Sequence, residues 1–207
     1  MAEAKTKEKK PQVASVKGMY HYMNRAWRKQ SPEYVIALRG KMIEWRAGDR
    51  ITKVEKPFRL DRARSLGYKA KKGILVMRVV IQRGGRHKSR PNAHRRQKRF
   101  NTKKILGMNY RWVAEQKAQR KYKNLEVLNS YLIGQDGKFY FFEVIMVDKT
   151  VPEIKKDPKF RFLQHPANKF RAFRGLTSAA KKSRGLRSHA RNLKVRPSLR
   201  SWKRHGK

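Results

Sequence analysis

Residues that could carry out catalysis or bind a metal are few in this chain. Its 207 residues include 14 Asp and Glu and no Cys, and its six His stand at positions 21, 87, 94, 165, 189 and 205. No pair of these histidines has a carboxylate at ligand spacing, so no metal site is predicted. The acids fall singly, whereas Mg²⁺-assisted phosphate chemistry needs them clustered. No P-loop, GxGxxG or Ser–His–Asp arrangement is present, so we predict neither enzymatic activity nor a cofactor.

Four of the acids have simpler structural interpretations. Asp136 is interpreted as a turn residue. Asp61, Glu143 and Asp148 are interpreted as helix or strand residues rather than as members of an acid–base pair. The chemistry of this sequence is therefore sought in its cations.

Lys and Arg dominate the composition. The chain has 56 of them and a formal net charge of +42. A compact chain with that charge repels itself unless a polyanion takes up its field, so nucleic acid or an anionic membrane leads the candidate partners. The charge is not arranged on one amphipathic helix, which disfavours a membrane surface. With no apolar stretch of 18 residues and no secretory signal, a soluble, internal protein is expected.

The densest group of cations follows the apolar run ILVMRVVI at 74–81. Between Arg83 and Lys104, ten of 22 residues are Lys or Arg and none is acidic. Gly84 and Gly85 at the start of this segment allow a sharp turn and a close approach of backbone N–H groups to phosphate. Arginine binds phosphate oxygens bidentately. A solvated charged surface is the alternative, but so many unpaired cations favour contact with RNA or DNA.

A second basic segment ends the chain. No acid follows Asp157, and the last fifty residues contain 16 Lys and Arg interleaved with aromatic and small residues. That mixture suits base stacking and close backbone approach. Phe170 and Phe173 fit either base stacking or anchoring to the core, whereas Trp202 is assigned to nucleic acid. Thr177 is suited to cap a short helix.

The kind of nucleic acid follows from what these segments lack. A sequence-specific DNA reader normally has a helix-turn-helix, zinc or basic-zipper signature, and none is visible. A DNA-compacting architectural protein remains the alternative. Long irregular basic segments suit the crevices of folded RNA better than the regular surface of a duplex, so RNA is favoured.

The elements that position these cations begin with helices. Apolar residues recur every three or four positions over 19–27, which predicts a short helix. A second helix is predicted from Ser31-Pro32 to Gly48, because a hydroxyl cap and Pro suit its start and Gly its end. Its buried face is predicted to carry Leu38, Met42 and Trp45. A third helix is predicted over 59–66, closed by Gly67.

The remaining elements are mostly strands. Residues 74–81 predict a strand covered on both faces, and 110–122 a helix with Trp112, Val113 and Ala118 buried. The strands 125–133 and 139–147 flank GQDGK, whose Asp-Gly should supply the positive-φ positions of a tight hairpin. The second of these strands, FYFFEVIMV, is apolar on both faces and is predicted to lie at the centre of the sheet.

Together these elements predict an α+β fold. It consists of a small sheet of about three to four mostly antiparallel strands with flanking helices, a long basic loop and extended terminal tails. The predicted organisation is a basic N-terminal extension over 1–17, a core over 18–156 that contains an RNA-binding loop at 83–107, and a basic C-terminal extension over 157–207.

Several stretches resemble the large-subunit ribosomal protein L-fifteen-e family of archaea and eukaryotes. They are RARSLGYKAKKG (62–73), VVIQRGGRHKSRP (79–91), LEVLNSYLIGQDGKFYFFEVIMVD (125–148) and FRGLTSAAKKSRGLR (173–187), with a looser match in MYHYMNRAWRKQ (19–30). Their combination in this order is specific, whereas any one alone is not. Residues 1–17, 92–106 and the end after Arg187 depart from the family pattern.

The resemblance implies an α+β core and a structural role in the large subunit of the cytoplasmic ribosome. It also implies binding to ribosomal RNA beside neighbouring ribosomal proteins, with no catalytic activity, cofactor, small-molecule substrate or membrane. The residues implied to lie against RNA are Arg83, Gly84, Gly85, Arg86, Arg174, Gly175, Lys181, Lys182, Ser183, Arg184 and Arg187. The predicted RNA contacts also include Lys69, Lys71, Lys72, Lys88, Arg90, Arg95, Arg96, Lys98, Arg99, Arg171, Arg191 and Trp202.

Overall fold

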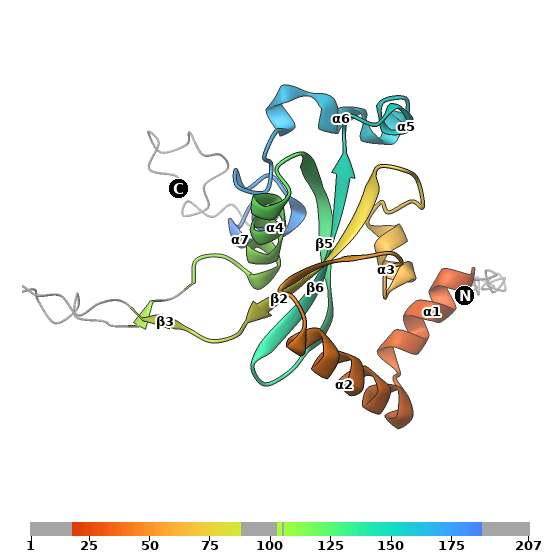
Figure 1. Cartoon of the computed structure of the whole chain (residues 1–207), viewed down its shortest axis with the longest axis vertical. Coiled ribbons are helices and arrows are strands. Elements are labelled where there is room, and N and C mark those ends of the chain that lie inside the picture. Colours follow the sequence, from red (N-terminus) through yellow and green to blue (C-terminus); the bar gives the residue numbers. More distant parts are fainter. Residues whose placement is uncertain (1–17, 88–102, 105, 188–207) are drawn as a thin grey trace, which may run out of the picture.

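The protein is built around a four-stranded antiparallel sheet with the strand order β1-β2-β6-β5 (Figure 1). This computed structural model describes residues 18–87, 103–104 and 106–187. The strands of the sheet are β1 (Ile51–Val54), β2 (Ile74–Gln82), β5 (Leu125–Gln135) and β6 (Phe139–Asp148). A second, two-stranded ladder pairs β3 (Arg86–His87) with β4 (Lys103–Lys104).

Helices cover both faces of the sheet. One face is covered from α2 (Pro32–Ala47), α3 (Leu60–Ser65), α5 (Pro152–Lys155) and α6 (Arg161–Gln164), with α1 (Met19–Arg28) packed on α3. Two 3₁₀ turns, η2 (Pro158–Phe160) and η3 (Pro166–Asn168), flank α6. The other face carries α4 (Tyr110–Lys121), and α7 (Ser178–Ser183) packs beside α4. The predicted α+β fold is confirmed.

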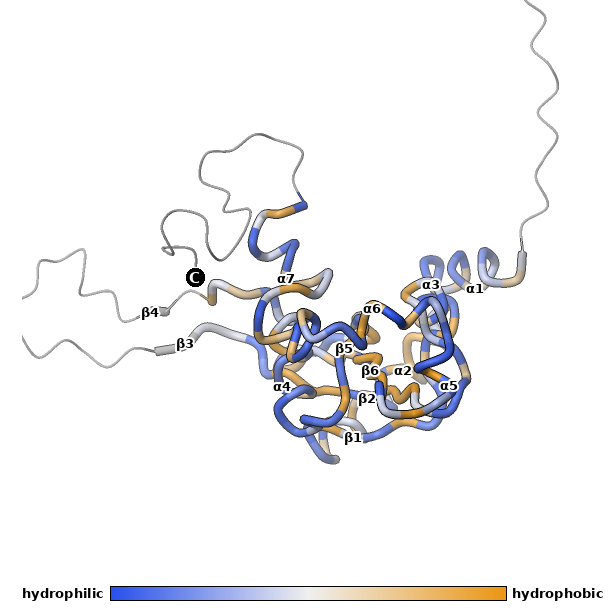
Figure 2. The backbone as a smooth tube through the Cα atoms, turned by 90° about the horizontal axis from the view of Figure 1, so that it is seen from above, coloured by the Kyte–Doolittle hydropathy of each residue, from blue (hydrophilic) through white to orange (hydrophobic). Residues whose placement is uncertain are grey.

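The side chains of the two central strands alternate between the two faces of the sheet, and each face has its own hydrophobic core. In β2, Val76 and Val80 point to the layer of α2, while Met77 and Val79 point to the layer of α4. Successive strand residues point to opposite faces, so a strand buried on both sides must be apolar at nearly every position. Figure 2 shows this as apolar stretches of β2, β5 and β6 at the centre of the molecule. As predicted, β6 lies inside the sheet, between β2 and β5.

The predicted helices form, and most of their caps are visible. Ser31 accepts a hydrogen bond from the Tyr34 N–H (3.3 Å) at the start of α2, and Thr177 accepts one from the Ala180 N–H (3.3 Å) at the start of α7. The predicted face of α2 is buried through Leu38, Met42 and Trp45. In α4, Val113 and Ala118 are buried but Trp112 is only half-buried.

Two local features differ from the prediction. The short edge strand β1, with the sequence ITKV, was not predicted because its alternation is too brief to stand out. The hairpin between β5 and β6 turns without positive φ at Gly137, so that prediction is wrong. Instead, the Asp136 carboxylate accepts hydrogen bonds from the N–H groups of Lys138 (2.7 Å) and Phe139 (2.5 Å), which fixes the turn. Asp136 is thus a turn residue, as interpreted.

Buried residues continue beyond the predicted end of the core at residue 156. Phe160, Leu163 and Ala172 are almost completely buried against the sheet layers, and Ala179 and Ala180 are buried in α7. The first part of the segment predicted as a C-terminal extension therefore packs on the core as far as α7. Residues 1–17 and 188–207 lie outside the described ranges.

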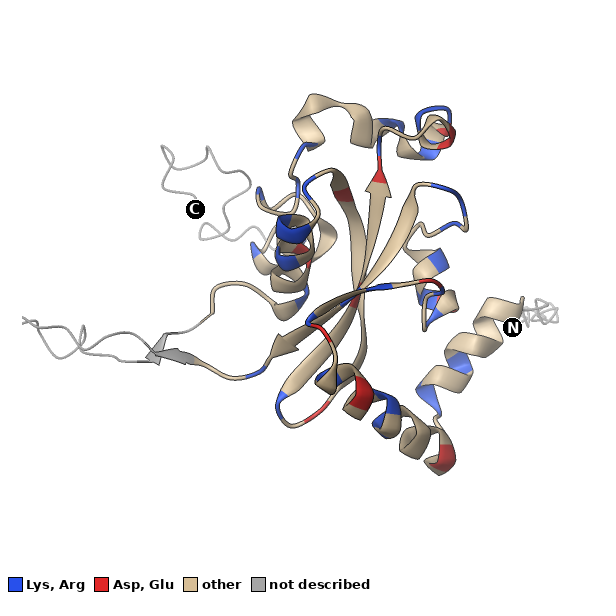
Figure 3. Ribbon diagram, in the orientation of Figure 1, with Lys and Arg blue, Asp and Glu red and all other residues tan. Residues whose placement is uncertain are grey.

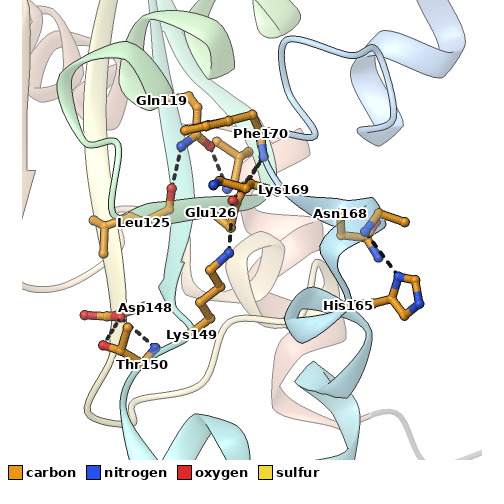
Figure 4. A network of polar contacts seen from close by, with 12 residues as sticks. Gln119, Leu125, Glu126, Asp148, Lys149, Thr150, His165, Asn168, Lys169 and Phe170 are labelled. Atoms are coloured by element: carbon orange, nitrogen blue, oxygen red, sulfur yellow. Dashed lines mark hydrogen bonds and ion pairs between the residues drawn. The ribbon is translucent and has the colours of Figure 1, made fainter.

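Side chains bond the backbone of the edge strand β5. The Gln119 amide donates to the carbonyls of Leu125 (2.5 Å) and Tyr122 (3.3 Å) and accepts from the Val127 N–H (3.3 Å). Figure 4 shows Gln119 above Leu125, beside the contact of Glu126 with Phe170. Further along β5, the guanidinium of Arg111 donates to the carbonyl of Ser130. An edge strand whose backbone is already bonded cannot readily pair with another chain.

Replacing Gln119 by Leu tests this role. The substitution leaves two carbonyls and one N–H without their partners inside the protein, so the free energy of unfolding should fall by about 2–4 kcal/mol. Gln116→Leu on the same helix is the control, because Gln116 is half-buried and should change the stability by less than about 0.5 kcal/mol. Urea unfolding of both variants measures the difference, and equal losses would contradict the assigned role.

Candidate nucleic-acid interface

The buried carboxylates are held by donors from this chain. Glu143 accepts hydrogen bonds from the Phe58 N–H (3.0 and 3.1 Å to its two oxygens) and from the Tyr131 hydroxyl. Burial raises the pKa of Glu143, while these hydrogen bonds and the nearby Arg78 act in the opposite direction. Asp61 accepts from Arg59 and Asn24, both at 3.0 Å. These acids join segments of the fold, which agrees with their structural interpretation.

Most of the surface Lys and Arg residues that the structure describes form no ion pair with a carboxylate. Within the described ranges, ion pairs to carboxylates involve Arg46, Arg59, Lys69, Lys71 and Lys149. A surface of unpaired cations is the electrostatic footprint expected of a nucleic-acid-binding protein.

The start of the basic loop is fixed in position. The Arg83 N–H donates to the Lys138 carbonyl (2.8 Å). The Arg83 guanidinium donates to the Asp136 carbonyl (2.5 Å) and lies over the Tyr140 ring (4.9 Å to the centroid). The Tyr110 hydroxyl accepts from the Gly84 N–H (3.2 Å) and donates to the Gly84 carbonyl (3.1 Å). Gly84 has a φ of +106°, so the predicted need for glycine is confirmed there.

The end of the loop is fixed by α7. Ser183 accepts a hydrogen bond from the Asn109 N–H (3.2 Å) and donates one to the Gly107 carbonyl (3.3 Å). The Asn109 amide donates to the Ala179 carbonyl (2.8 Å), while its oxygen caps α4 by accepting from the Trp112 N–H (2.8 Å). The described residues at both ends of the basic loop therefore meet the start of α4, and those at its second end also contact α7. Figure 1 shows residues 83–87 leaving the sheet on the side of α4.

These contacts connect the segments that carry several predicted site residues to the start of α4. Arg83 is exposed where the loop begins, Lys181 and Lys182 are exposed on α7, and Arg187 is exposed four residues after it. We call these four residues the basic cluster. Figure 3 shows further Lys and Arg on the neighbouring α4. No ion pair with a carboxylate is found for the cluster among the described residues.

Other predicted site residues serve the fold. Arg171 donates to the carbonyls of Val127 (3.3 Å) and Leu128 (3.5 Å), and burial lowers the pKa of its guanidinium. Arg184 donates to the Gly175 carbonyl (2.9 Å). Gly175 is buried with a φ of +71°, and a Cβ there would lie 2.9 Å from Cδ of Arg184. Arg174 is exposed but donates to the Ala167 carbonyl (2.6 Å).

A third group lies at the opposite end of β2. Lys69 and Lys71 both bond Asp157, at 3.0 and 2.9 Å, and Lys72 is exposed beside them. The ammonium groups of Lys71 and Lys69 hold the pKa of Asp157 well below its usual range. The nine residues of β2 separate this group from Arg83 by about 30 Å at about 3.3 Å per residue. The structure thus divides the predicted site into two regions.

Phe170 shows why the start of the C-terminal segment stays on the core. Its N–H donates to both oxygens of Glu126 (3.0 and 3.1 Å), and Lys149 approaches the same carboxylate at 3.7 Å (Figure 4). Its ring is half-buried, which supports the anchoring alternative. Phe173 is 39% exposed, with its ring centroid 6.4 Å from that of Phe170.

The residue that positions α7 was missed from the sequence. Glu115 is fully buried in α4 and accepts hydrogen bonds from the hydroxyls of Ser130 and Thr177, both at 2.5 Å. Burial raises the pKa of Glu115, and the two hydroxyls and Arg111 act against that shift. Its position beside Ala114 and near Ala118 placed it on the buried side of a predicted helix, but nothing in the sequence named its partners. Asn109, by contrast, carried a visible signal, since Asn before a helix is a preferred cap.

Some predicted contacts fall outside the described residues. They are Lys88, Arg90, Arg95, Arg96, Lys98, Arg99, Arg191 and Trp202, and Arg86 is described only as part of β3. Within the described ranges, no group of three or more His, Asp and Glu is arranged to hold a metal ion. None of the helices found there has the length and apolar character needed to cross a bilayer.

Alanine substitutions of two glycines test whether Gly175 serves the fold. Gly175→Ala places a Cβ at positive φ against Arg184, so the free energy of unfolding should fall by about 1–2 kcal/mol. Gly85→Ala is the matched control, because Gly85 lacks positive φ and a Cβ there meets no atom within 4 Å. Urea unfolding should show a loss only for Gly175→Ala. Equal stability of the two variants would contradict the structural role of Gly175.

The Asp157 cluster predicts a pH dependence. A carboxyl whose pKa is depressed by folding stabilises the protein above its unfolded pKa, about 3.9, and this contribution is lost as the pH falls. Asp157→Asn should therefore be less stable than the unmodified protein at pH 7, with the difference shrinking below about pH 4. Thermal unfolding across this range measures it, with Glu153→Gln as the control at a neighbouring exposed acid. A difference independent of pH would contradict the assignment.

The chain matches one known protein family over most of its length. A family model described as Ribosomal L15 matches residues 18–202, which is most of the chain and includes the sheet, both helical layers and the basic cluster. The match confirms the resemblance noted in the sequence. The chain therefore belongs to the ribosomal L15e family, a family of structural proteins of the large ribosomal subunit.

Proposed function

We propose that the protein binds large-subunit ribosomal RNA through the basic cluster and the loop that begins there. By doing so it stabilises the folded RNA and supports subunit assembly and translation in the cytoplasmic ribosome, beside neighbouring ribosomal proteins. The observation that carries this proposal is that exposed cations without a carboxylate partner, Arg83 in one part of the sequence and Lys181, Lys182 and Arg187 in another, belong to segments that both bond the start of α4.

The proposed mechanism is replacement of counterions by fixed cations. Folded RNA brings phosphates close together, and each Lys or Arg that neutralises a phosphate releases a condensed counterion. The cluster is suited to this because hydrogen bonds between Gly84 and Tyr110, and between Ser183 and both Asn109 and Gly107, already fix the neighbouring backbone. Less conformational entropy is then lost when RNA binds.

The glycines at the start of the loop support a close approach of the RNA backbone. Gly84 is required by its own positive φ, whereas a Cβ on Gly85 would meet no protein atom within 4 Å. Nothing within the described part of the protein therefore demands glycine at position 85. A phosphate group lying against this backbone would supply the reason, since glycine permits the closest approach.

The residue assignments are narrower than those made from the sequence. Arg83, Lys181, Lys182 and Arg187 are proposed as phosphate contacts, with Arg86 next to them along the chain and Lys72 as an outlying contact. Arg171, Gly175 and Arg184 are proposed to act through the fold, because their bonds and packing are internal. The eight predicted contacts outside the described ranges remain predictions.

A charge-matched pair of variants tests this proposal. Lys181→Gln, Lys182→Gln and Arg187→Gln together should weaken binding to full-length large-subunit ribosomal RNA. They should also reduce the slope of log K against log salt by about 2–3, since each lost phosphate contact removes about 0.7–0.9. The control removes the same charge from α1 and the residue after it, through Arg25→Gln, Arg28→Gln and Lys29→Gln. Filter binding between 50 and 300 mM salt should leave the control's slope closer to that of the unmodified protein.

Two results would count against the proposal. Equal changes of slope in the two triple variants would show that net charge alone drives binding. Equal affinity of the unmodified protein for ribosomal RNA and for random duplex DNA at physiological salt would favour the DNA-compacting alternative.

A further inference from the structure

We propose that the outward face of α2 is a docking site for an amphipathic helix of another protein of the large subunit. This inference rests on the proposed function in one respect, namely that the chain is part of that subunit. It concerns a different surface from that of α7, because α2 lies on the face of the sheet opposite to α4, beside which α7 packs (Figure 1). Arg83 of the basic cluster borders the α2 surface, since it lines one pocket together with Ile43 and Arg46. We call the outward line of Ile36, Gly40, Ile43 and Ala47 the α2 stripe.

The first argument is that α2 is apolar on two opposite sides. Its inner side is buried through Leu38, Met42 and Trp45. On its outer side, Ile36 and Ile43 are 67% and 57% exposed. The four residues of the α2 stripe follow each other at intervals of four, three and four, which places them on one face of a helix. An exposed apolar stripe opposite the buried side of a helix is a candidate for cover by a partner.

The second argument comes from Gly40. Glycine inside a helix costs about 1 kcal/mol relative to Ala. A Cβ at Gly40 would meet no atom within 4 Å, so packing within the described part of the protein does not require this glycine. Small residues between large ones let two helices approach closely, with the flanking side chains fitting into the partner's grooves. Ile36 and Ile43 flank Gly40 in this way.

The third argument is that the stripe is bordered by acids as well as by cations. Five carboxylate residues are exposed in the described ranges, and two of them, Glu33 and Glu44, are on α2, beside the exposed cations Arg39, Lys41 and Arg46. Figure 3 shows the acidic positions on α2. Carboxylates repel phosphate, and exposed isoleucines cannot stack on bases as aromatic side chains do.

The charged residues along the two edges of the α2 stripe indicate which kind of helix would bind there. With about 100° between successive helix residues, Glu33 and Glu44 lie along one edge of the stripe, whereas Arg39 and Arg46 lie along the other. Arg46 is already paired with Asp136 at 3.3 Å, which leaves Arg39 on its edge against two carboxylates on the other edge. The occupant is therefore a helix with its own apolar stripe and with Lys or Arg facing Glu33 and Glu44.

Two other occupants fit less well. Residues 1–17 of this chain contain few large apolar side chains, only Met1, Val13 and Val16, and are broken by Pro11. A second copy of the chain would bring two net charges of +42 together, which opposes association. Both remain distinguishable outcomes of the experiment below.

Photo-crosslinking in assembled subunits tests the proposal. The full chain is expressed in cells with a benzophenone amino acid in place of Ile43, and purified large subunits are irradiated. We expect a crosslink to one ribosomal protein, mapped by mass spectrometry to a segment with apolar residues at helical spacing and Lys or Arg beside them. The positive control carries the benzophenone in place of Lys182 and is expected to crosslink to ribosomal RNA.

A matched pair of substitutions shows whether docking uses the stripe. Gly40→Leu adds a side chain where the partner should approach, so the yield of the Ile43 crosslink should fall about tenfold or more. Lys41→Leu is the control, since Lys41 is also exposed on α2 but points about 140° away from Ile36. Neither variant should lower the thermal stability of the isolated chain, because Leu is a better helix former than Gly and about as good as Lys.

The outcomes separate the two proposals. A crosslink from position 43 to RNA, to residues 1–17 or to a second copy would overturn the docking site while leaving the RNA-binding proposal intact. The absence of any crosslink from position 43, with the Lys182 position still reaching RNA, would also overturn it. Failure of the chain to enter large subunits would overturn both proposals.

Discussion

The scarcity of carboxylates is the constraint on which the rest of the structure depends. Fourteen acids accompany 56 cations, so most cations cannot be paired within the protein. The buried acids lie where each one holds backbone or hydroxyl donors, as Glu143 does for Phe58 and Glu126 does for Phe170. Acids used in this way join distant segments but neutralise little of the surface. The fold is therefore stabilised internally, while its exterior keeps a charge that only an external polyanion can balance.

The same constraint explains how the basic cluster is organised. Polar groups other than carboxylates position it: the Tyr110 hydroxyl, the Asn109 amide and the Ser183 hydroxyl fix the two ends of the loop without cancelling its charge. One buried carboxylate, Glu115, holds the Thr177 turn that leads into α7. Two of the five exposed acids in the described ranges, Glu33 and Glu44, are on α2, beside the exposed Ile36 and Ile43. The two proposals accordingly assign the side of α7 to RNA and the outward face of α2 to a protein partner.

Periodicity in the sequence was sufficient for the main elements but not for the roles of single residues. The cap at Ser31, the buried face of α2 and the central position of FYFFEVIMV all followed from local spacing. The edge strand β1 did not, because four residues hold too little alternation. Arg171 and Gly175 show the deeper difficulty, since an arginine that bonds carbonyls and one that bonds phosphates look alike in a sequence. Only packing distinguishes them, and packing depends on residues far away, such as Arg184 for Gly175.

The measurement that tests this account most directly is the salt dependence of binding between the unmodified protein and large-subunit ribosomal RNA. The basic cluster with Arg86 supplies five fixed cations, so the slope of log K against log salt should be steeper than about −4 and accompany tight binding at physiological salt. A shallow slope, or binding that persists unchanged in high salt, would mean that the surplus charge does not find its counterpart in RNA phosphates.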